Sequence, residues 1–122
     1  MAFAAGLPGG HTLNDCLLTL IATPELEERL VDWLLEANYA GFMTAPCHGH
    51  GVHPERLSTA EQVAGQQRRT AFWLQLSQEQ AESIVQGLAE HFGGAGLHFW
   101  ITPVLAAGPI VTPPSVPTRG QD

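Results

Sequence analysis

Residues 70–94 read TAFWLQLSQEQAESIVQGLAEHFGG, and this stretch decides the fold. Its first seven residues alternate, with Phe72 and Leu74 on one side and Trp73 on the other. Strict alternation over this length is typical of a β-strand that packs one face on a core. We therefore expect a strand over residues 70–76.

A helix is expected to follow directly. Ser77 and Gln80 have the spacing of a capping box, which marks a helix start. The apolar positions then recur every three or four residues, at Ala81, Ile84, Val85, Leu88, Ala89 and Phe92. Gly93 and Gly94 end the pattern, as glycines commonly do after a helix.

The same strand-then-helix order precedes this stretch. Residues 16–21 form a short apolar run, which predicts a buried strand. Thr23 is the expected N-cap of a helix whose first residue is Pro24. The apolar face of that helix comprises Leu26, Leu30, Trp33, Leu34 and Ala37. Asn38 and Gly41 are expected to end it.

Two further strands complete the pattern, over residues 42–48 and 97–104. Pro46 in the first of them indicates an edge strand or a bulge. The resulting order, βαββαβ, predicts an α+β protein with the ferredoxin-like fold. It has a four-stranded antiparallel sheet, two helices on one face and a long loop between strands 2 and 3.

The domain is expected to span residues 15–107. Residues 1–14 are rich in Gly, Ala and Pro and are predicted to form a flexible N-terminal arm. Residues 108–122 contain several prolines and predict a disordered tail.

The sheet face without helices is expected to carry Trp73, together with Trp100 or Phe99. An exposed apolar patch of this kind on a small protein usually marks an interface. We therefore expect a homo-oligomer in which the sheets pack against one another.

Composition excludes several classes of function. The 122 residues carry 12 acidic and 5 basic side chains, a net charge of −7, and every basic residue is an arginine. Such a chain is not expected to bind nucleic acid, and without lysine it cannot be a P-loop NTPase. It has no apolar run of about 18 residues and no signal-peptide pattern, so membrane insertion is not expected. With only two cysteines, a cytoplasmic location is expected.

The long connection between the central strands holds a cluster of possible metal ligands: Cys47, His48, His50 and His53. These are the ligand types that Zn(II), Cu(I) and Ni(II) prefer. If the strand continues, His48 and His50 project from the same face. The site is either local or shared between subunits, and the alternative is a polar loop without a metal.

The same segment has features of an anion site. Gly49, His50 and Gly51 expose backbone N–H groups, and Arg68-Arg69 is the only pair of adjacent positive charges. Because neighbouring residues on a strand face opposite ways, at most one arginine points into a given cleft. The alternative is that both arginines are solvated or pair with acidic residues.

No motif indicates an enzyme: the chain lacks a nucleophile elbow and an HExxH sequence. Cys16 is expected in the core, and His91 at a helix end that favours a cation.

The chain resembles the PII-like (GlnB-like) superfamily, which also contains the CutA-like copper-tolerance proteins. It is most similar to an uncharacterised PII-like family associated with heavy-metal efflux systems. The matching segments are residues 16–21, 41–44, 49–51, 57–58, 61–65 and 68–72.

The resemblance implies a signalling or regulatory homotrimer that binds a small ligand in its intersubunit clefts. Its mobile loop would act on a partner, a membrane transporter or an efflux pump. It implies a ligand site at Gly49, His50, Gly51, Arg68 and Arg69. The ligand of PII signalling proteins is an adenine nucleotide. Here the loop after the second helix has no lysine, and the only tyrosine, Tyr39, lies elsewhere. An adenine nucleotide, another anion and a metal ion all stay open, and the alternative function is a metal-binding accessory in heavy-metal tolerance.

Overall fold

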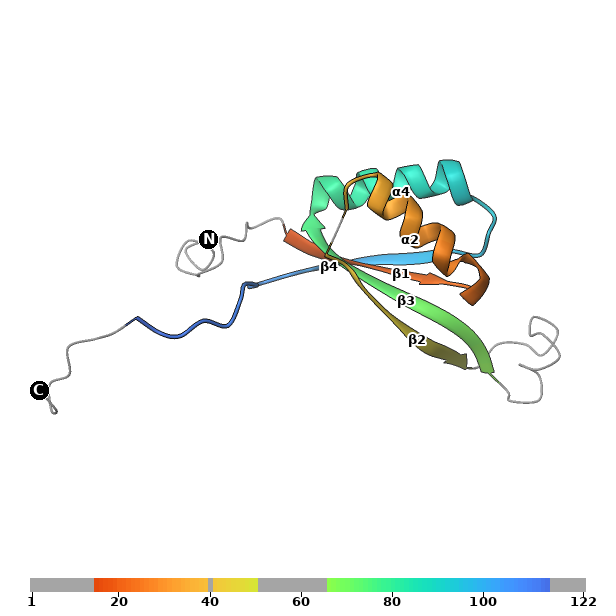
Figure 1. The fold of residues 1–122 in the computed structure, drawn as a ribbon. Helices are drawn as coiled ribbons and strands as arrows, with labels where there is room; N and C mark the ends of the chain where they lie inside the picture. The colour runs from red at the N-terminus through yellow and green to blue at the C-terminus, as the bar shows by residue number, and fades with distance from the viewer. Residues whose placement is uncertain (1–14, 40, 51–65, 115–122) are drawn as a thin grey trace, which may run out of the picture.

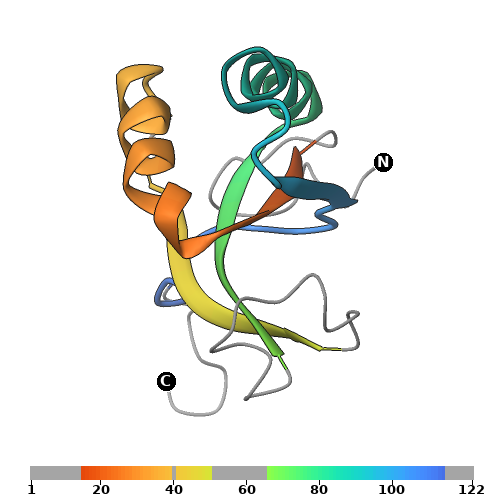
Figure 2. The same cartoon turned by 90° about the vertical axis from the view of Figure 1, so that its right-hand side faces the viewer.

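The computed structural model describes residues 15–39, 41–50 and 66–114. In order, these residues form β1 (Asp15–Ala22), the 3-10 turn η1 (Pro24–Leu26), α2 (Glu27–Glu36), β2 (Met43–His50), β3 (Gln66–Ser77), α4 (Gln78–Phe92) and β4 (His98–Pro103). The strands make one antiparallel sheet in the order β2-β3-β1-β4. Both helices lie on the same face of this sheet (Figure 1, Figure 2). The expected α+β, ferredoxin-like fold is confirmed.

The core lies between the helices and the sheet. Alternate residues of β1, among them Leu18 and Leu20, are fully buried against the helices. Leu30 and Leu34 of α2 and Ile84 of α4 meet them from the other layer. The spacing of the apolar residues therefore predicts which face of each helix and strand is buried, because each element turns one side toward the core.

The two helix starts differ in how they are capped. At α4 the capping box is present: the Gln80 backbone N–H donates to Ser77 Oγ, and the Ser77 N–H donates to Gln80 Oε1, both at 3.1 Å. Thr23 is the N-cap residue and Pro24 is the first residue of the turn, as predicted, but the Thr23 side chain makes no capping hydrogen bond. The chain enters α2 through the turn Pro24–Leu26 instead, and the Leu26 N–H donates to the Thr23 carbonyl.

The central hairpin is longer than the alternation predicted. β3 begins at Gln66 rather than at residue 70, and β2 continues to His50. Residues 66–69 of β3 pair only with residues 47–50 of β2, since the register with β1 ends at Thr70. We call these eight residues the two-stranded extension. They project past the four-stranded part of the sheet.

The sheet face turned away from the helices, here called the open face, carries a row of side chains across all four strands. Cross-strand register places Met43, Trp73, Thr19 and Trp100 side by side in that row. Thr19 is only 3% exposed although no helix covers it, because Trp73 and Trp100 flank it on either side. The expected apolar face therefore exists, with Trp100 as its half-exposed edge.

The alternative that Phe99 belongs to this face was wrong. Phe99 pairs with Leu20, a core residue, so it lies on the helix side of the sheet. Trp100, the next residue, therefore faces the opposite way.

No helix in the described parts of the chain is long and apolar enough to cross a membrane. The predicted N-terminal arm, the segment 51–65 and the last eight residues lie outside the described residues.

Candidate functional site

The two-stranded extension holds most of the residues that the sequence singled out. Its cross-strand pairs are Cys47 with Arg69, His48 with Arg68, Gly49 with Gln67, and His50 with Gln66. Directly opposed residues of an antiparallel pair share a face, and successive residues alternate. The extension therefore has a helix-side surface with His48, His50 and Arg68, and an open-face surface with Cys47, Gly49 and Arg69.

This geometry places the predicted metal ligands of the extension on opposite sides of β2. His48 and His50 lie on the same side of β2, because the strand continues to His50 as the prediction required. Cys47 lies on the other side, and His53 is outside the described residues. Among residues 15–39, 41–50 and 66–114, no three His, Cys, Asp or Glu side chains come together as a metal site.

For the predicted anion site, the two arginines point to opposite sides of β3, in agreement with the alternation argument. Arg68 shares its side with His50, and Arg69 shares its side with Gly49. The Arg69 guanidinium donates a hydrogen bond to the main-chain carbonyl of Arg68 at 2.6 Å. Gly51, the fifth predicted residue, lies outside the described residues.

Charge is distributed very unevenly over the described residues. The nine acidic side chains among them are all on β1, η1, α2 or α4, at positions 15, 25, 27, 28, 32, 36, 79, 82 and 90. β2, β3 and β4 contain none. Two of the three arginines in the described parts, Arg68 and Arg69, are on the extension, and the third is Arg29 of α2. The extension is thus a basic element on an acidic protein.

A hydrogen bond that the sequence did not predict fixes the base of the extension. The Thr70 hydroxyl, which is buried, donates to Glu27 Oε1 at 2.9 Å. This bond attaches the start of α2 to β3, directly beside the point where the register with β1 ends. The two residues are 43 positions apart, so no local pattern could have revealed the contact.

Two other residues that the sequence singled out, Cys16 and His91, have structural roles. Cys16 is buried, as expected, and burial raises the pKa of its thiol, with smaller contributions from Asp15 and Glu82. A protonated, buried thiol is a poor metal ligand. His91 Nδ1 is 2.9 Å from the Gly87 carbonyl and its ring packs on Trp33. His98 begins β4, the edge strand opposite β2.

The fold defines a class of protein. A four-stranded antiparallel sheet with this strand order, two helices on one face and a long central hairpin is the architecture of PII-like proteins. The chain belongs to the family described as "Protein of unknown function (DUF3240)", whose model matches residues 12–111. No curated protein matches the chain.

Three solved structures show the similarity. A DUF3240 family protein from Shewanella baltica has a TM-score of 0.65 and 21% identity, covering 82% of this chain and all of that one. A putative PII-like signaling protein from Thermus thermophilus has a TM-score of 0.55 and 25% identity, covering 74% and 86%. CPII, a nitrogen regulatory PII-like protein from Thiomonas intermedia bound to ADP, AMP and bicarbonate, has a TM-score of 0.59 and 16% identity, covering 79% and 96%. The expected PII-like resemblance is confirmed.

Proposed function

We propose that this chain is a PII-like regulatory protein that binds a small anion in the clefts between associated copies. The uneven distribution of charge carries the proposal. In the described parts, β2 and β3 of the central hairpin contain no acidic residue, although Glu27 of α2 hydrogen-bonds to Thr70 at its base, whereas Arg68 and Arg69 lie on the hairpin. Among the described residues, the extension is therefore the part of the protein that should attract an anion most strongly.

Association of copies is supported by the open face. Its row of Met43, Trp73, Thr19 and Trp100 is apolar and continuous across the sheet. Patches of this kind on small proteins are usually covered by a partner. A homotrimer, which the resemblance implies, would cover the face and turn its margins into clefts. Arg69 lies on that margin, since it shares the open face with Trp73 on β3.

The chemistry of the arginine side chain indicates the class of ligand. Guanidinium groups bind carboxylate, phosphate and bicarbonate oxygens through charge-assisted hydrogen bonds. The similarity to CPII, whose structure is bound to ADP, AMP and bicarbonate, supports these three as probes. The loop after α4 is Gly93-Gly94-Ala95-Gly96 and has no lysine to hold a polyphosphate, which favours a small or singly phosphorylated anion.

Titration calorimetry with ADP, AMP and bicarbonate tests the proposal. We expect at least one of them to release heat on binding. Arg69→Gln should weaken that binding about tenfold or more, because it removes a charge-assisted hydrogen bond. Arg68→Gln removes the same charge from the opposite side of β3 and should change the affinity less than about threefold.

This pair of variants distinguishes an effect of the position of the arginine from an effect of the net charge of the protein. Equal losses in both would mean that only overall charge matters and would contradict a site in the open-face cleft. The absence of heat from all three probes would remove the anion-binding function.

A second candidate function, metal binding in heavy-metal tolerance, is favoured by one observation. His48 and His50 lie two residues apart on the same side of an exposed strand end, which is suitable for two nitrogen ligands. The described residues alone give an incomplete set, so His53 or a second copy would have to complete it. Zn(II), Cu(I) or Ni(II) would serve there as the bound ion.

Competition with a chromogenic chelator for Zn(II) and Ni(II) tests this candidate. The double variant His48→Asn, His50→Asn should lose about tenfold or more in metal affinity, while His98→Asn should not. Acidification should weaken binding in the parent protein, because protonated imidazole cannot ligate a metal. Unchanged affinity in the double variant would contradict the candidate.

The regulated partner is proposed from the resemblance as a membrane transporter or efflux pump. We propose a binding function rather than a catalytic one, because the sequence contains no nucleophile elbow and no HExxH motif.

A further inference from the structure

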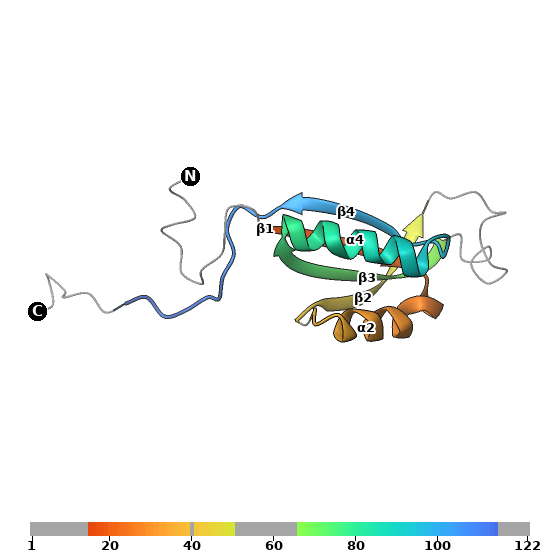
Figure 3. The same ribbon diagram turned by 90° about the horizontal axis from the view of Figure 1, so that it is seen from above.

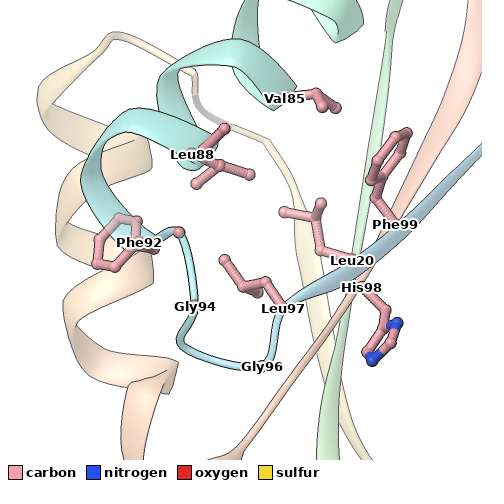
Figure 4. Close-up of a pocket in the computed structure, with 11 residues that line it drawn as sticks. Leu20, Val85, Leu88, Phe92, Gly94, Gly96, Leu97, His98 and Phe99 are labelled. Atoms are coloured by element: carbon pink, nitrogen blue, oxygen red, sulfur yellow. The ribbon is translucent and has the colours of Figure 1, made fainter.

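An apolar cavity opens between α4 and β4. Its volume is about 520 Å³, and it is lined mainly by Leu20, Val85, Leu88, Phe92, Leu97 and Phe99. Figure 4 shows Leu20, Leu88 and Leu97 pointing into this space, while the His98 imidazole points away from it. The volume lies in the range of about 300–1,000 Å³ that is typical of binding cavities.

The cavity is open at one end because the turn that borders it is made largely of glycines. Gly94 and Gly96, both with a φ of +83°, form the turn at one end of it. Phe99, on the outer edge strand, is half exposed at the mouth. The apolar lining of the cavity is therefore exposed to water unless another group covers it.

Residues 104–114, here called the C-terminal arm, present apolar side chains that their own domain does not bury. Val104 makes the last backbone hydrogen bond to the sheet, from its N–H to the Asp15 carbonyl at 3.1 Å. Beyond it, Leu105, Ile110 and Val111 are exposed, and Ile110 is 100% exposed. Figures 1 and 3 show the arm running away from the sheet.

The arm and the cavity of one chain lie at opposite ends of β4. The cavity is beside His98, where β4 begins, and the arm leaves after Pro103, where it ends. Six residues of extended strand span about 20 Å. Because the arm continues away from the sheet beyond Pro103, it does not turn back toward its own cavity.

The arm and the cavity are both uncharged. Residues 104–114 read VLAAGPIVTPP and contain no ionisable side chain. Of the cavity-lining residues only His98 can ionise, and its ring points away. Two copies of a chain with a net charge of −7 repel each other overall, and an uncharged segment in an uncharged cavity adds no local repulsion.

We propose that the C-terminal arm of one copy packs its Ile110 and Val111 side chains into the α4–β4 cavity of a second copy. The arm then links two domains without using the open face. This contact goes beyond the proposed function, because it requires neither the anion nor the metal.

Disulfide cross-linking between two differently labelled copies of the full-length protein tests the proposal. Both copies carry Cys47→Ser, so that the buried Cys16 is the remaining native thiol. One copy carries Ala89→Cys, at an exposed cavity-lining position, and the other carries Ile110→Cys. Under mild oxidation we expect a disulfide-linked heterodimer on a non-reducing gel. Its yield should be about tenfold or more above that of a control pair with Glu36→Cys in place of Ala89→Cys.

A matched pair of arm variants checks that the contact is apolar. In the Ile110→Cys copy, Val111→Asp should lower the yield about fivefold or more, whereas Thr112→Asp should leave it within about twofold. Equal yields for Ala89→Cys and Glu36→Cys, or equal effects of the two aspartates, would overturn the proposal. An internal disulfide in a doubly substituted chain at high dilution would also overturn it, by showing that the arm fills its own cavity. None of these outcomes depends on ligand binding, so failure here is distinguishable from failure of the proposed function.

Discussion

Trp100→Glu is expected to break the association of copies through the open face that the proposed function requires. Trp100 is 50% exposed at the edge of the apolar row on the open face, where it flanks the buried Thr19. In an interface formed by this face, a carboxylate at position 100 would be buried without a partner. An uncompensated buried charge costs about 3–5 kcal/mol, so the dissociation constant should rise about 100-fold or more. Sedimentation velocity over a range of concentrations measures this change.

Leu35→Glu is the matched control for that experiment. Leu35 is 51% exposed, almost the same as Trp100, but it lies on α2 in the helix layer. It should therefore leave the sedimentation behaviour unchanged. The far-ultraviolet circular dichroism of both variants should match the parent, because neither side chain belongs to the buried core. A parent protein that sediments as a monomer at all concentrations would contradict both the interface and the cleft that depends on it.

Much of the fold could be predicted because each element has a local signature. Alternation gave the strand over residues 70–76, and the capping box at Ser77 gave the start of α4. Proline at position 46 correctly indicated an edge strand, since β2 is the outermost strand of the sheet. These signals lie within a few residues of one another, so they do not depend on tertiary contacts.

The features that were missed depend on pairing between distant segments. Residues 66–69 read QQRR, with no apolar alternation, yet they are strand because β2 supplies their hydrogen-bond partners. The side on which Phe99 lies follows from its register with Leu20, which no single-strand pattern reveals. A shift of one residue in register would have exchanged the two faces.

The candidate site was predictable in residue type but less so in arrangement. The opposite orientation of Arg68 and Arg69 followed from strand geometry alone. The separation of Cys47 from His48 and His50 follows from the same rule, but only once the strand is known to reach His50. The hydrogen bond from Thr70 to Glu27 could not be predicted, because it joins separate elements.

The packing of α2 against α4 is the other feature that sequence could not show. Trp33 of α2 lies over Gly87 of α4, and a Cβ at position 87 would be 2.8 Å from Trp33 Cζ2 and 2.9 Å from Cη2. The indole is also held by its neighbours, with ring-centroid distances of 5.8 Å to His91 and 6.2 Å to Phe92. A glycine in the middle of a helix thus permits close contact between the two helices.

Gly87→Ala is therefore expected to destabilise the fold, although alanine is the better helix former. The gain in helix propensity is about 1 kcal/mol, whereas overpacking a tight contact typically costs about 1–3 kcal/mol. Because Trp33 also contacts the rings of His91 and Phe92, we expect the larger cost to apply and the free energy of unfolding to fall by about 1–2 kcal/mol. Urea denaturation at a fixed protein concentration measures this loss.

The sign of the effect should reverse when the indole is removed. In a Trp33→Leu background, Gly87→Ala meets no aromatic ring and should stabilise the protein by up to about 1 kcal/mol, the usual helix-propensity gain. The double-mutant cycle should therefore give a coupling of about 2 kcal/mol between positions 33 and 87. Ala89→Gly, at an exposed position on the same helix, should cost about 1 kcal/mol in either background. If Gly87→Ala were stabilising in the parent protein, the close packing of Trp33 on α4 would be contradicted, since only that contact opposes the propensity gain.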